Sequence, residues 1–338
     1  MPGVFSFGRV NVDIVFRIRE SKVVRGARHV IEEVTARGGG SGANTAIAAS
    51  RFLGGAEKVY LVGCVGDDQE GKSQIEELRK ENIDLSFMKV AEDELTGRAY
   101  VVLDGENEST IFSFTGANEK LTKEDLLRSG LQDKLNYASA VVVTNVSRTL
   151  AFDLLTMIKS LKTKVFVDPG KSFLSFKEDI VKFFPLNSYY LPNLYEFLEV
   201  MNSNSRFLTK SIDELLNVRP DLKLVLKLGY KGAVYIEKES NELLYVNAVP
   251  LAKLGLKIVD LTGCGDTFTG VLTASLAEKS DVEQALVYSS VAAGLKATKY
   301  GARASPRREE IENFIKKYND IIKVKRIDVK GLKRILRS

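Results

Sequence analysis

Short, almost continuously apolar runs alternate with helical patterns along this chain, and this alternation limits its fold more than any other feature. Runs of strand length, rich in β-branched residues, lie at Val59–Val65, Ala140–Thr144, Lys164–Asp168 and Lys223–Leu228. Such runs are typical of strands that are buried on both faces. Helical patterns lie between and beyond them, at Gly71–Asn82, Leu150–Leu161, Asp266–Glu278 and Glu283–Thr298. Alternating strands and helices predict an α/β fold in which helices cover a parallel sheet.

Two segments interrupt this alternation. Val12–Val34 and Gly97–Phe114 have the mixed or alternating polarity of strands, with Gly and Asn turns and no helical pattern inside them. Half-exposed antiparallel strands have this pattern. We therefore expect a small sheet that projects from the main domain as a lid, formed by about residues 12–36 and 97–114.

The composition excludes several classes of protein. The chain has 338 residues, of which 44% are hydrophobic and 28% charged, and these values do not fit a disordered, collagen-like or disulfide-rich protein. Its two cysteines, Cys64 and Cys264, favour a reducing cytosol over secretion. No apolar run reaches the roughly 18 residues of a membrane span, and the first residues lack the pattern of a signal peptide. We expect a cytoplasmic protein that does not bind a membrane.

Positive charge is concentrated near the C-terminus. Residues 316–338 carry a net charge of +7, whereas residues 1–315 carry −2. We expect one catalytic domain over residues 1–318, followed by a basic extension over residues 319–338. Gln and Met are rare while Lys and Glu are abundant, a compositional trend of thermophilic proteins.

One segment matches a known phosphate-binding loop. Gly66–Ser73 fits the pattern G-x4-G-K-[ST] and lies between a predicted strand and a predicted helix. Such a loop surrounds phosphates with backbone N–H groups and a lysine, but Asp67, Asp68 and Glu70 would repel those phosphates. We favour an ordinary turn whose acidic residues begin a helix, where the helix dipole stabilises them. The alternative is a P-loop nucleoside triphosphatase that uses Lys72.

A glycine-rich segment, Arg37–Asn44, precedes another helical pattern. Its spacing fits a loose form of the dinucleotide-binding motif, although the segment before it is not a buried strand. Glycines here would let a ligand approach the backbone, and they would equally serve as a hinge between lid and main domain. The residues alone leave both interpretations open.

The most specific motif is Asp260–Phe268, with the sequence DLTGCGDTF. The N–H groups of Gly263, Cys264 and Gly265 would begin the following helix unpaired and form an anion site. Asp266 would stand beside that anion. A carboxylate there is repelled unless it has a chemical role, such as taking a proton from an attacking hydroxyl. The alternative is a carboxylate that only caps the helix.

Several motifs, in order along the chain, resemble those of the ribokinase family of carbohydrate and nucleoside kinases, the phosphofructokinase-B type. The resemblance covers about residues 4–318 and rests on Asn11–Asp13, Gly39–Asn44, Gly63–Asp68, Thr115–Asn118, Asn193–Glu196 and Asp260–Asp266. It implies a Rossmann-like αβα domain of three layers with a small β-sheet lid. It also implies a kinase that uses ATP and Mg²⁺ and phosphorylates a hydroxyl of a small sugar.

The resemblance further implies roles for single residues. Asp266 would be the general base, beside the amides of Gly263, Cys264 and Gly265. The sugar would be held by Asn11, Asp13, Gly39, Gly40 and Asn44. The nucleotide would be bound by Asn193, Glu196, Lys227, Gly229, Gly232 and Gly301. Glu196 would face Mg²⁺ through water, and Asp260 with Thr262 would help to hold a monovalent cation such as K⁺.

The substrate within this class stays open. Ser41 stands where ribokinases proper carry Lys, which argues against ribose itself. Arg9, Arg37 and Arg98 lie near the predicted pocket and lid, and one of them is a candidate for binding a phosphate already present on a sugar. We favour solvated lid charges over that role. A nucleoside kinase and a sugar-phosphate kinase remain alternatives to a sugar kinase.

The basic extension suggests a different class, because basic tails bind the phosphates of nucleic acids. No aromatic residue follows Tyr318 to stack on bases, so we regard nucleic acid as an improbable partner. The exposed edges of a projecting sheet would suit a homodimer formed through the lids.

Overall fold

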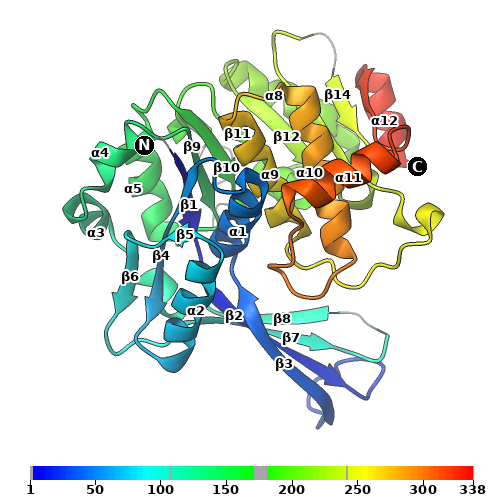
Figure 1. Cartoon of the computed structure of the whole chain (residues 1–338). Coiled ribbons are helices and arrows are strands. Elements are labelled where there is room, and N and C mark those ends of the chain that lie inside the picture. Colours follow the sequence, from blue (N-terminus) through cyan, green and yellow to red (C-terminus); the bar gives the residue numbers. More distant parts are fainter. Residues whose placement is uncertain (1–2, 107–108, 171–180, 241–242, 338) are drawn as a thin grey trace.

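A large sheet runs through the middle of the molecule (Figure 1). The computed structural model describes residues 3–106, 109–170, 181–240 and 243–337, and within these residues the sheet has eleven strands. From one edge to the other it consists of β15 (Val324–Ile327), β14 (Leu243–Val246), β13 (Ala233–Ile236), β12 (Lys223–Lys227), β11 (Tyr189–Tyr190), β10 (Lys164–Asp168), β9 (Ala140–Thr144), β1 (Gly3–Gly8), β4 (Lys58–Gly66) and β5 (Ile83–Asp84), with β6 (Met88–Ala91) beside β4.

The middle of this sheet is parallel, as predicted. β1 pairs with β4 and β9, and parallel pairing continues through β10, β11 and β12. β13, β14 and β15 add antiparallel strands at one edge. The four predicted buried strands are all present, and β9 and β10 have the predicted bounds. In a parallel sheet all carboxyl ends lie at one edge, which is where ligands bind in folds of this class.

Helices cover both faces of the sheet. One face carries α1 (Ser41–Leu53), α2 (Gln69–Lys80), α9 (Cys264–Ala277), α10 (Val282–Ala297) and α11 (Arg308–Lys317). The other face carries α3 (Lys123–Arg128), α4 (Leu131–Leu135), α5 (Arg148–Ile158), α7 (Leu194–Val200), α8 (Leu208–Val218) and α12 (Val329–Arg337). Short 3₁₀ turns are η1 (Gly116–Glu119), η3 (Ser205–Phe207), η4 (Gly229–Lys231) and η5 (Leu251–Leu254). The three αβα layers confirm the predicted fold.

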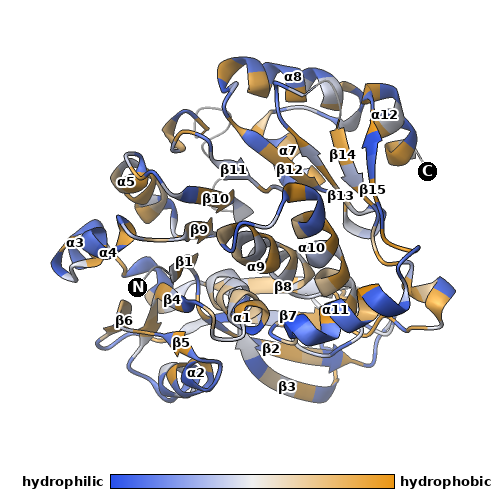
Figure 2. Cartoon of the chain, turned by 45° about the horizontal axis from the view of Figure 1, so that its top comes forward, coloured by the Kyte–Doolittle hydropathy of each residue, from blue (hydrophilic) through white to orange (hydrophobic). Residues whose placement is uncertain are grey.

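Two hydrophobic cores lie on opposite faces of the sheet, because successive residues of a strand point to opposite sides. Val4 of β1 packs into the core under α1, α9 and α10, and its neighbour Phe5 packs into the core under α5 and α8. The outer α11 is largely hydrophilic in Figure 2 and buries only Ile311 and Phe314. The sheet is therefore a rigid, buried platform for residues at its edge.

A second sheet projects from the main domain, with the order β3 (Ile31–Gly39), β2 (Asn11–Ile18), β7 (Gly97–Leu103) and β8 (Ser109–Phe114) (Figure 1). β2–β3 and β7–β8 are antiparallel, as expected of the lid. The central pair, β2 and β7, is parallel, and here the expectation of an antiparallel sheet was wrong. Both strands leave the main domain in the same direction, and the long connection that parallel pairing requires passes through that domain.

The basic segment after residue 318 is part of the main domain. β15 pairs with β14 at the sheet edge, and Leu332 of α12 is buried in the core under α5 and α8. Residues 319–338 were expected to form an extension, but those that are described complete a sheet edge and add a helix. No helix in the described residues is long and apolar enough to cross a membrane.

Candidate active site

The motif Asp260–Asp266 leads into α9, which begins at Cys264. Gly263 precedes the helix with φ +77°, and a Cβ at this position would lie 2.3 Å from the Ala302 carbonyl oxygen. No side chain caps the first turn of α9, so the helix N-terminus presents N–H groups and a positive dipole end to an anion. The Cys264 N–H itself donates to the Leu261 carbonyl at 3.2 Å. Of the three predicted amides, those of Gly263 and Gly265 are therefore better placed for an anion.

Asp266 stands in the first turn of α9 and touches α1. The Asn44 Nδ2 donates to Asp266 Oδ2 at 2.7 Å. Burial raises the pKa of Asp266 to about 6, and the Asp168 and Asp13 carboxylates act in the same direction, whereas Asn44 and Lys227 oppose them. A carboxylate with a pKa near neutrality can accept a proton at one step and release it at another.

The other end of the Asn44 amide lacks a partner. Asn44 is only 4% exposed, and its Oδ1 is buried without a hydrogen bond in the described part of the chain. An unsatisfied buried carbonyl oxygen costs free energy unless a donor reaches it. Because the Nδ2 of the same amide is fixed on Asp266, a donor at Oδ1 would lie close to the carboxylate.

The lid contributes Asn11 and Asp13 from one face of β2, two positions apart. Asp13 packs over Gly39, where a Cβ would lie 2.2 Å from both carboxylate oxygens. A side chain at position 39 would therefore displace the Asp13 carboxylate. Burial raises the pKa of Asp13 to about 6, with Arg303 opposing the shift and Asp260 adding to it. Asp13 also contributes to the raised pKa of Asp266, so the lid carboxylate and the α9 carboxylate lie in one site.

Asn118, in η1, fixes the start of β2. Its Oδ1 accepts from the Val10 N–H at 2.9 Å, and its Nδ2 donates to Asn11 Oδ1 at 2.9 Å and to the Thr115 carbonyl at 2.9 Å. Gly97 leaves room for this contact, since a Cβ there would lie 2.1 Å from Asn118 Nδ2. The Thr115–Asn118 motif therefore orients Asn11 from the lid base.

A buried cation lies behind the anion site. Lys227, at the end of β12, forms an ion pair with Asp168 at the end of β10, and Thr269 of α9 donates to Asp168 Oδ2 at 2.6 Å. Burial lowers the pKa of Lys227, but Asp168 and Glu196 more than offset this, so that its pKa lies above the ordinary value. A Cβ on Gly265 would be 3.9 Å from Lys227 Nζ. The ammonium therefore adds positive charge beside the first turn of α9.

The motif Asn193–Glu196 forms the start of α7. The Glu196 N–H donates to Asn193 Oδ1 at 2.9 Å, and the Asn193 N–H donates to Glu196 Oε2 at 2.8 Å. This reciprocal pair is a capping box. Burial and the Asp168 charge raise the pKa of Glu196, and Lys227 opposes them. Asn193 and Glu196 thus border the same charged cluster as Lys227.

Two glycine turns flank this cluster. Gly229 and Gly232 frame η4 with φ +62° and +103°, and the Lys231 Nζ of that turn donates to the Leu336 carbonyl at 2.8 Å. Gly301, in the loop after α10, has φ +90°, and its N–H donates to Asp260 Oδ2 at 2.8 Å. The proposed nucleotide residues therefore come from loops at the carboxyl ends of strands and from the loop beside α9.

Arg98 lies on the other face of the lid. Its register opposite Val12 places it away from Asn11 and Asp13. Its Nε donates to Glu70 Oε2 at 2.6 Å, and its NH2 lies 3.8 Å from Asp68 Oδ2. The guanidinium is thus joined to the start of α2, and the structure does not bring Arg98 together with the other proposed sugar residues.

The segment Gly66–Ser73 is an ordinary turn into α2. Asp68 caps the helix by accepting from the Gly71 N–H at 2.8 Å, and it also accepts from the Thr96 N–H at 2.9 Å and hydroxyl at 2.6 Å. Lys72 is exposed. With a carboxylate where phosphate would sit, the P-loop interpretation has no support in the geometry.

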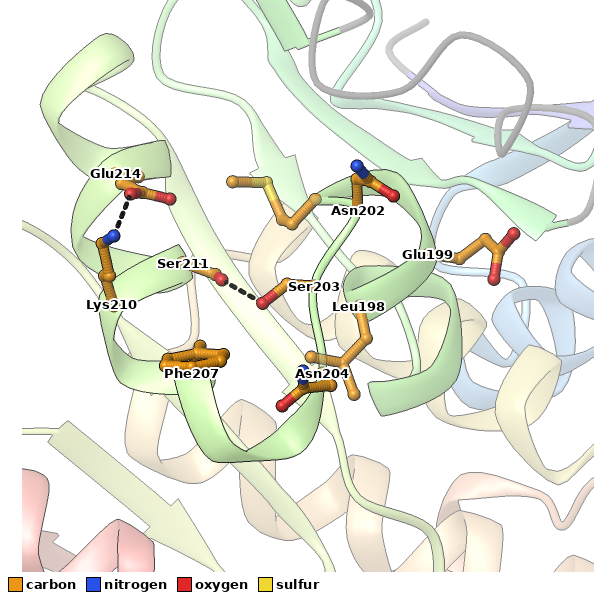
Figure 3. A pocket seen from close by; sticks show the side chains of 10 residues that line it. Leu198, Glu199, Asn202, Ser203, Asn204, Phe207, Lys210, Ser211 and Glu214 are labelled. Carbon is orange, nitrogen blue, oxygen red and sulfur yellow. Dashed lines mark hydrogen bonds and ion pairs between the residues drawn. The ribbon is translucent and has the colours of Figure 1, made fainter.

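The described residues contain no group of three or more His, Cys, Asp or Glu side chains arranged to hold a metal ion. A cavity of about 490 Å³ lies elsewhere, between α7 and α8. Figure 3 shows its polar wall, with the Ser211–Ser203 hydrogen bond and the Lys210–Glu214 ion pair. None of the predicted site residues lines this cavity.

Sequence reasoning missed several residues of the site, namely Asp168, Thr269, Lys296 and Arg303. Asp168 ends a predicted parallel strand, and this position was a usable signal. Thr269 and Lys296 lie inside helical patterns and have the appearance of ordinary helix residues. Arg303 donates to the Gly39 carbonyl at 2.7 Å and pairs with Glu77 of α2, contacts that only the fold creates.

Comparisons with known proteins agree with this geometry. The family model described as pfkB family carbohydrate kinase matches residues 1–309. A ribokinase of Bacillus subtilis is 28% identical over 278 residues, which are 82% of this chain and 87% of the relative. An ATP-dependent ribose-1-phosphate kinase of Halopiger xanaduensis is 25% identical over 316 residues, 93% of this chain and 98% of the relative.

The fold has close structural relatives as well. The structure of a ribokinase from Giardia lamblia superposes with a TM-score of 0.81 at 22% identity, covering 94% of this chain and 99% of that one. The family match spans most of the sequence. The chain therefore belongs to the PfkB family of carbohydrate kinases, ATP-dependent phosphotransferases with an alcohol group as acceptor.

Proposed function

We propose that this enzyme transfers the γ-phosphoryl group of ATP to a hydroxyl of a small neutral sugar, with Asp266 as the general base. One observation carries the proposal. The Asp266 carboxylate, with its pKa raised to about 6, stands at the uncapped start of α9 and is held by Asn44. A proton acceptor thus lies beside a site for a transferring phosphoryl group.

The proposed reaction consists of one proton transfer and one phosphoryl transfer. The sugar hydroxyl gives its proton to an Asp266 oxygen while its own oxygen forms a bond to the γ-phosphorus. The bond from that phosphorus to the bridging oxygen breaks, and its electron pair leaves with ADP. The N–H groups of Gly263 and Gly265 and the nearby Lys227 ammonium oppose the charge on the transferring group.

Contacts on the sugar side support a neutral polyol. Asn44 Oδ1 lacks a partner within the described residues and would accept a hydroxyl, and Asp13 and Asn11 would bind others from the lid. Gly39 lets the Asp13 carboxylate pack against the backbone, and Gly40 lets the Arg9 backbone approach closely. Asp13 and Asp266 put two carboxylates on this side, with Arg303 near Asp13 as the opposing cation, and two carboxylates disfavour a sugar that already carries a phosphate. Arg98, turned to the other lid face, does not compensate for them.

On the nucleotide side we propose Asn193, Glu196, Lys227, Gly229, Gly232 and Gly301. Mg²⁺ would reach this side with the phosphates of ATP, and Glu196 would face it through water, in keeping with the ion's preference for few protein carboxylates and several waters. The chemistry that Mg²⁺ supplies when bound is neutralisation of phosphate charge.

The test is a phosphoryl-transfer screen over neutral sugars, sugar phosphates and nucleosides, with ATP and Mg²⁺. We expect the highest kcat/KM with a neutral sugar. Faster transfer to a nucleoside or a sugar phosphate would contradict the proposed substrate class but not the proposed general base. Release of phosphate without any phosphorylated acceptor would contradict the kinase proposal itself.

We also propose a homodimer through the lids. The lid face opposite Asp13 carries Ile14, Phe16, Val34, Tyr100, Phe112 and Phe114. Val34 and Phe112 are each 56% exposed, and apolar faces of this kind mark interaction sites. Light scattering should give twice the monomer mass, and Val34→Glu with Phe112→Glu should give monomers. A wild-type monomer at all concentrations would contradict this.

A further inference from the structure

Lys296, near the end of α10, is buried beside the proposed active site. Its side chain is 0% exposed. The Nζ donates to the Asp260 carbonyl at 2.8 Å and to the Lys299 carbonyl at 3.3 Å, and it lies 3.9 Å from Asp260 Oδ2. An ammonium has three N–H donors and no acceptor, and three oxygens surround this one. The surroundings are those of a buried cation.

This cation joins two loops that border the anion site. Asp260 receives hydrogen bonds from the Thr262 N–H at its Oδ1 and from the Gly301 N–H at its Oδ2, both at 2.8 Å. The first of these loops continues into Gly263, which packs against Ala302 of the second. Lys296 therefore holds in place the segment that leads from Asp260 into the first turn of α9.

The family resemblance implies a monovalent cation at Asp260 and Thr262, and the residues present do not fit one. The Asp260 carbonyl and carboxylate already face the Lys296 ammonium. A second positive charge beside it would be repelled in surroundings of low dielectric constant. The ammonium has the single charge of K⁺ and a similar size, but it is attached to the chain.

We propose that Lys296 takes the place of the monovalent cation, as a positioning residue that makes this enzyme independent of K⁺. The inference rests on the proposed kinase function for its effect on turnover, but not for its effect on nucleotide binding. Two readouts are therefore used: kcat/KM for the sugar, and the affinity for Mg²⁺-ADP by calorimetry. A failure of the kinase proposal would remove the first readout and leave the second.

The first experiment is a salt series on the wild-type protein, at about 0.1 M of K⁺, Na⁺ or tetramethylammonium chloride so that general screening is equal. We expect ADP affinity and kcat/KM to agree within about twofold across the three salts. A rise of about fivefold or more in ADP affinity with K⁺ alone would overturn the proposal.

The second experiment uses Lys296→Ala, which makes room for an ion. In tetramethylammonium, we expect a loss of about tenfold or more in ADP affinity, as for supporting residues of metal sites. We expect K⁺ to recover most of it. Equal loss in all three salts would overturn the proposal, because a merely structural role predicts no recovery by K⁺. Lys316→Met, at an exposed site on α11, is the matched control and should not respond to K⁺. If Lys296→Ala does not fold, Lys296→Ser, which also makes room for an ion, replaces it and is judged by the same two outcomes.

Discussion

The side-chain amide of Asn44 donates a 2.7 Å hydrogen bond to Asp266, across 222 positions of the chain. The bond joins the first helix after the lid to the start of α9. It places Asp266, the proposed proton acceptor, in direct contact with Asn44, which we propose to bind the sugar. A change at either residue is therefore expected to alter both sugar binding and proton transfer.

Asp266→Asn keeps the shape of the side chain but cannot accept a proton. We expect kcat to fall by about 10²-fold or more, the usual range for loss of a general base. The measurement is kcat at saturating sugar and ATP, with ADP affinity as the test of an intact site. Near-normal turnover with ADP bound would refute the assignment.

Lys72→Ala tests whether the nucleotide phosphates bind at Gly66–Ser73, as in a P-loop, or at the start of α9. Lys72 is exposed and Asp68 occupies the turn before it, so we expect kcat and KM for ATP within about twofold of wild type. A P-loop would require this lysine, and loss of all nucleotide turnover would therefore support the rejected interpretation.

The pH dependence should follow Asp266. Because its pKa is about 6, the base is protonated below that value, and kcat/KM should fall as the pH falls through it. Asn44→Ala removes a hydrogen bond that lowers this pKa, so the acid limb should move to higher pH. The check is a pH profile of both proteins, and an unmoved limb in the variant would show that Asp266 does not determine it.

Asp13→Asn should stabilise the fold near neutral pH. The folded pKa of about 6 lies above the ordinary 3.8, so the folded state keeps the proton longer than the unfolded state. Stability from this group is greatest at low pH and is lost as the pH rises through about 6. Tm should therefore gain more from the substitution at about pH 7 than at about pH 4.5, while KM for the sugar rises. Equal gains at both pH values would contradict the prediction.

Lys227→Met should lower the free energy of unfolding by about 3 kcal/mol or more, because Asp168 would keep a buried charge without its partner. Denaturant titration measures this loss. Lys227→Met combined with Asp168→Asn should recover much of the stability, and the double variant should not recover kcat, since the ammonium beside Gly265 is absent. Recovery of both would show that Lys227 has a structural role only.

The sheet was largely predictable, and its lid only in part. β9 and β10 have the predicted bounds because both faces of these strands are buried, so their residues are apolar throughout. The parallel pairing of β2 with β7 was not predictable from polarity, since one lid face contacts solvent in either arrangement. It depends on where the chain enters and leaves the main domain, which local patterns do not contain.

The backbone of the candidate site was predictable where a glycine-rich motif marks a backbone constraint, as at Gly263, which directly precedes α9. The site was not predictable where ordinary side chains meet only after folding. Asp168 and Lys227 are 59 positions apart and pair because β10 and β12, which lie on either side of β11, end at the same edge of the sheet. Arg98 was a candidate because it lies in the lid. A shift of one position along a strand moves a side chain to the opposite face of the sheet, and the register of Arg98 places it beside Glu70.

The contact between Lys231 and Leu336 has a consequence for how the protein is made. Ribosomes release a chain from its N-terminus at about 5–20 residues per second, so the lid and the sugar side emerge first. The turn η4, which we propose to bind the nucleotide, gains its contact with α12 only when the residues of that helix have left the ribosome. We therefore expect chains truncated before β15 to bind ATP more weakly than chains that contain β15 and α12, because the turn η4 then lacks this contact.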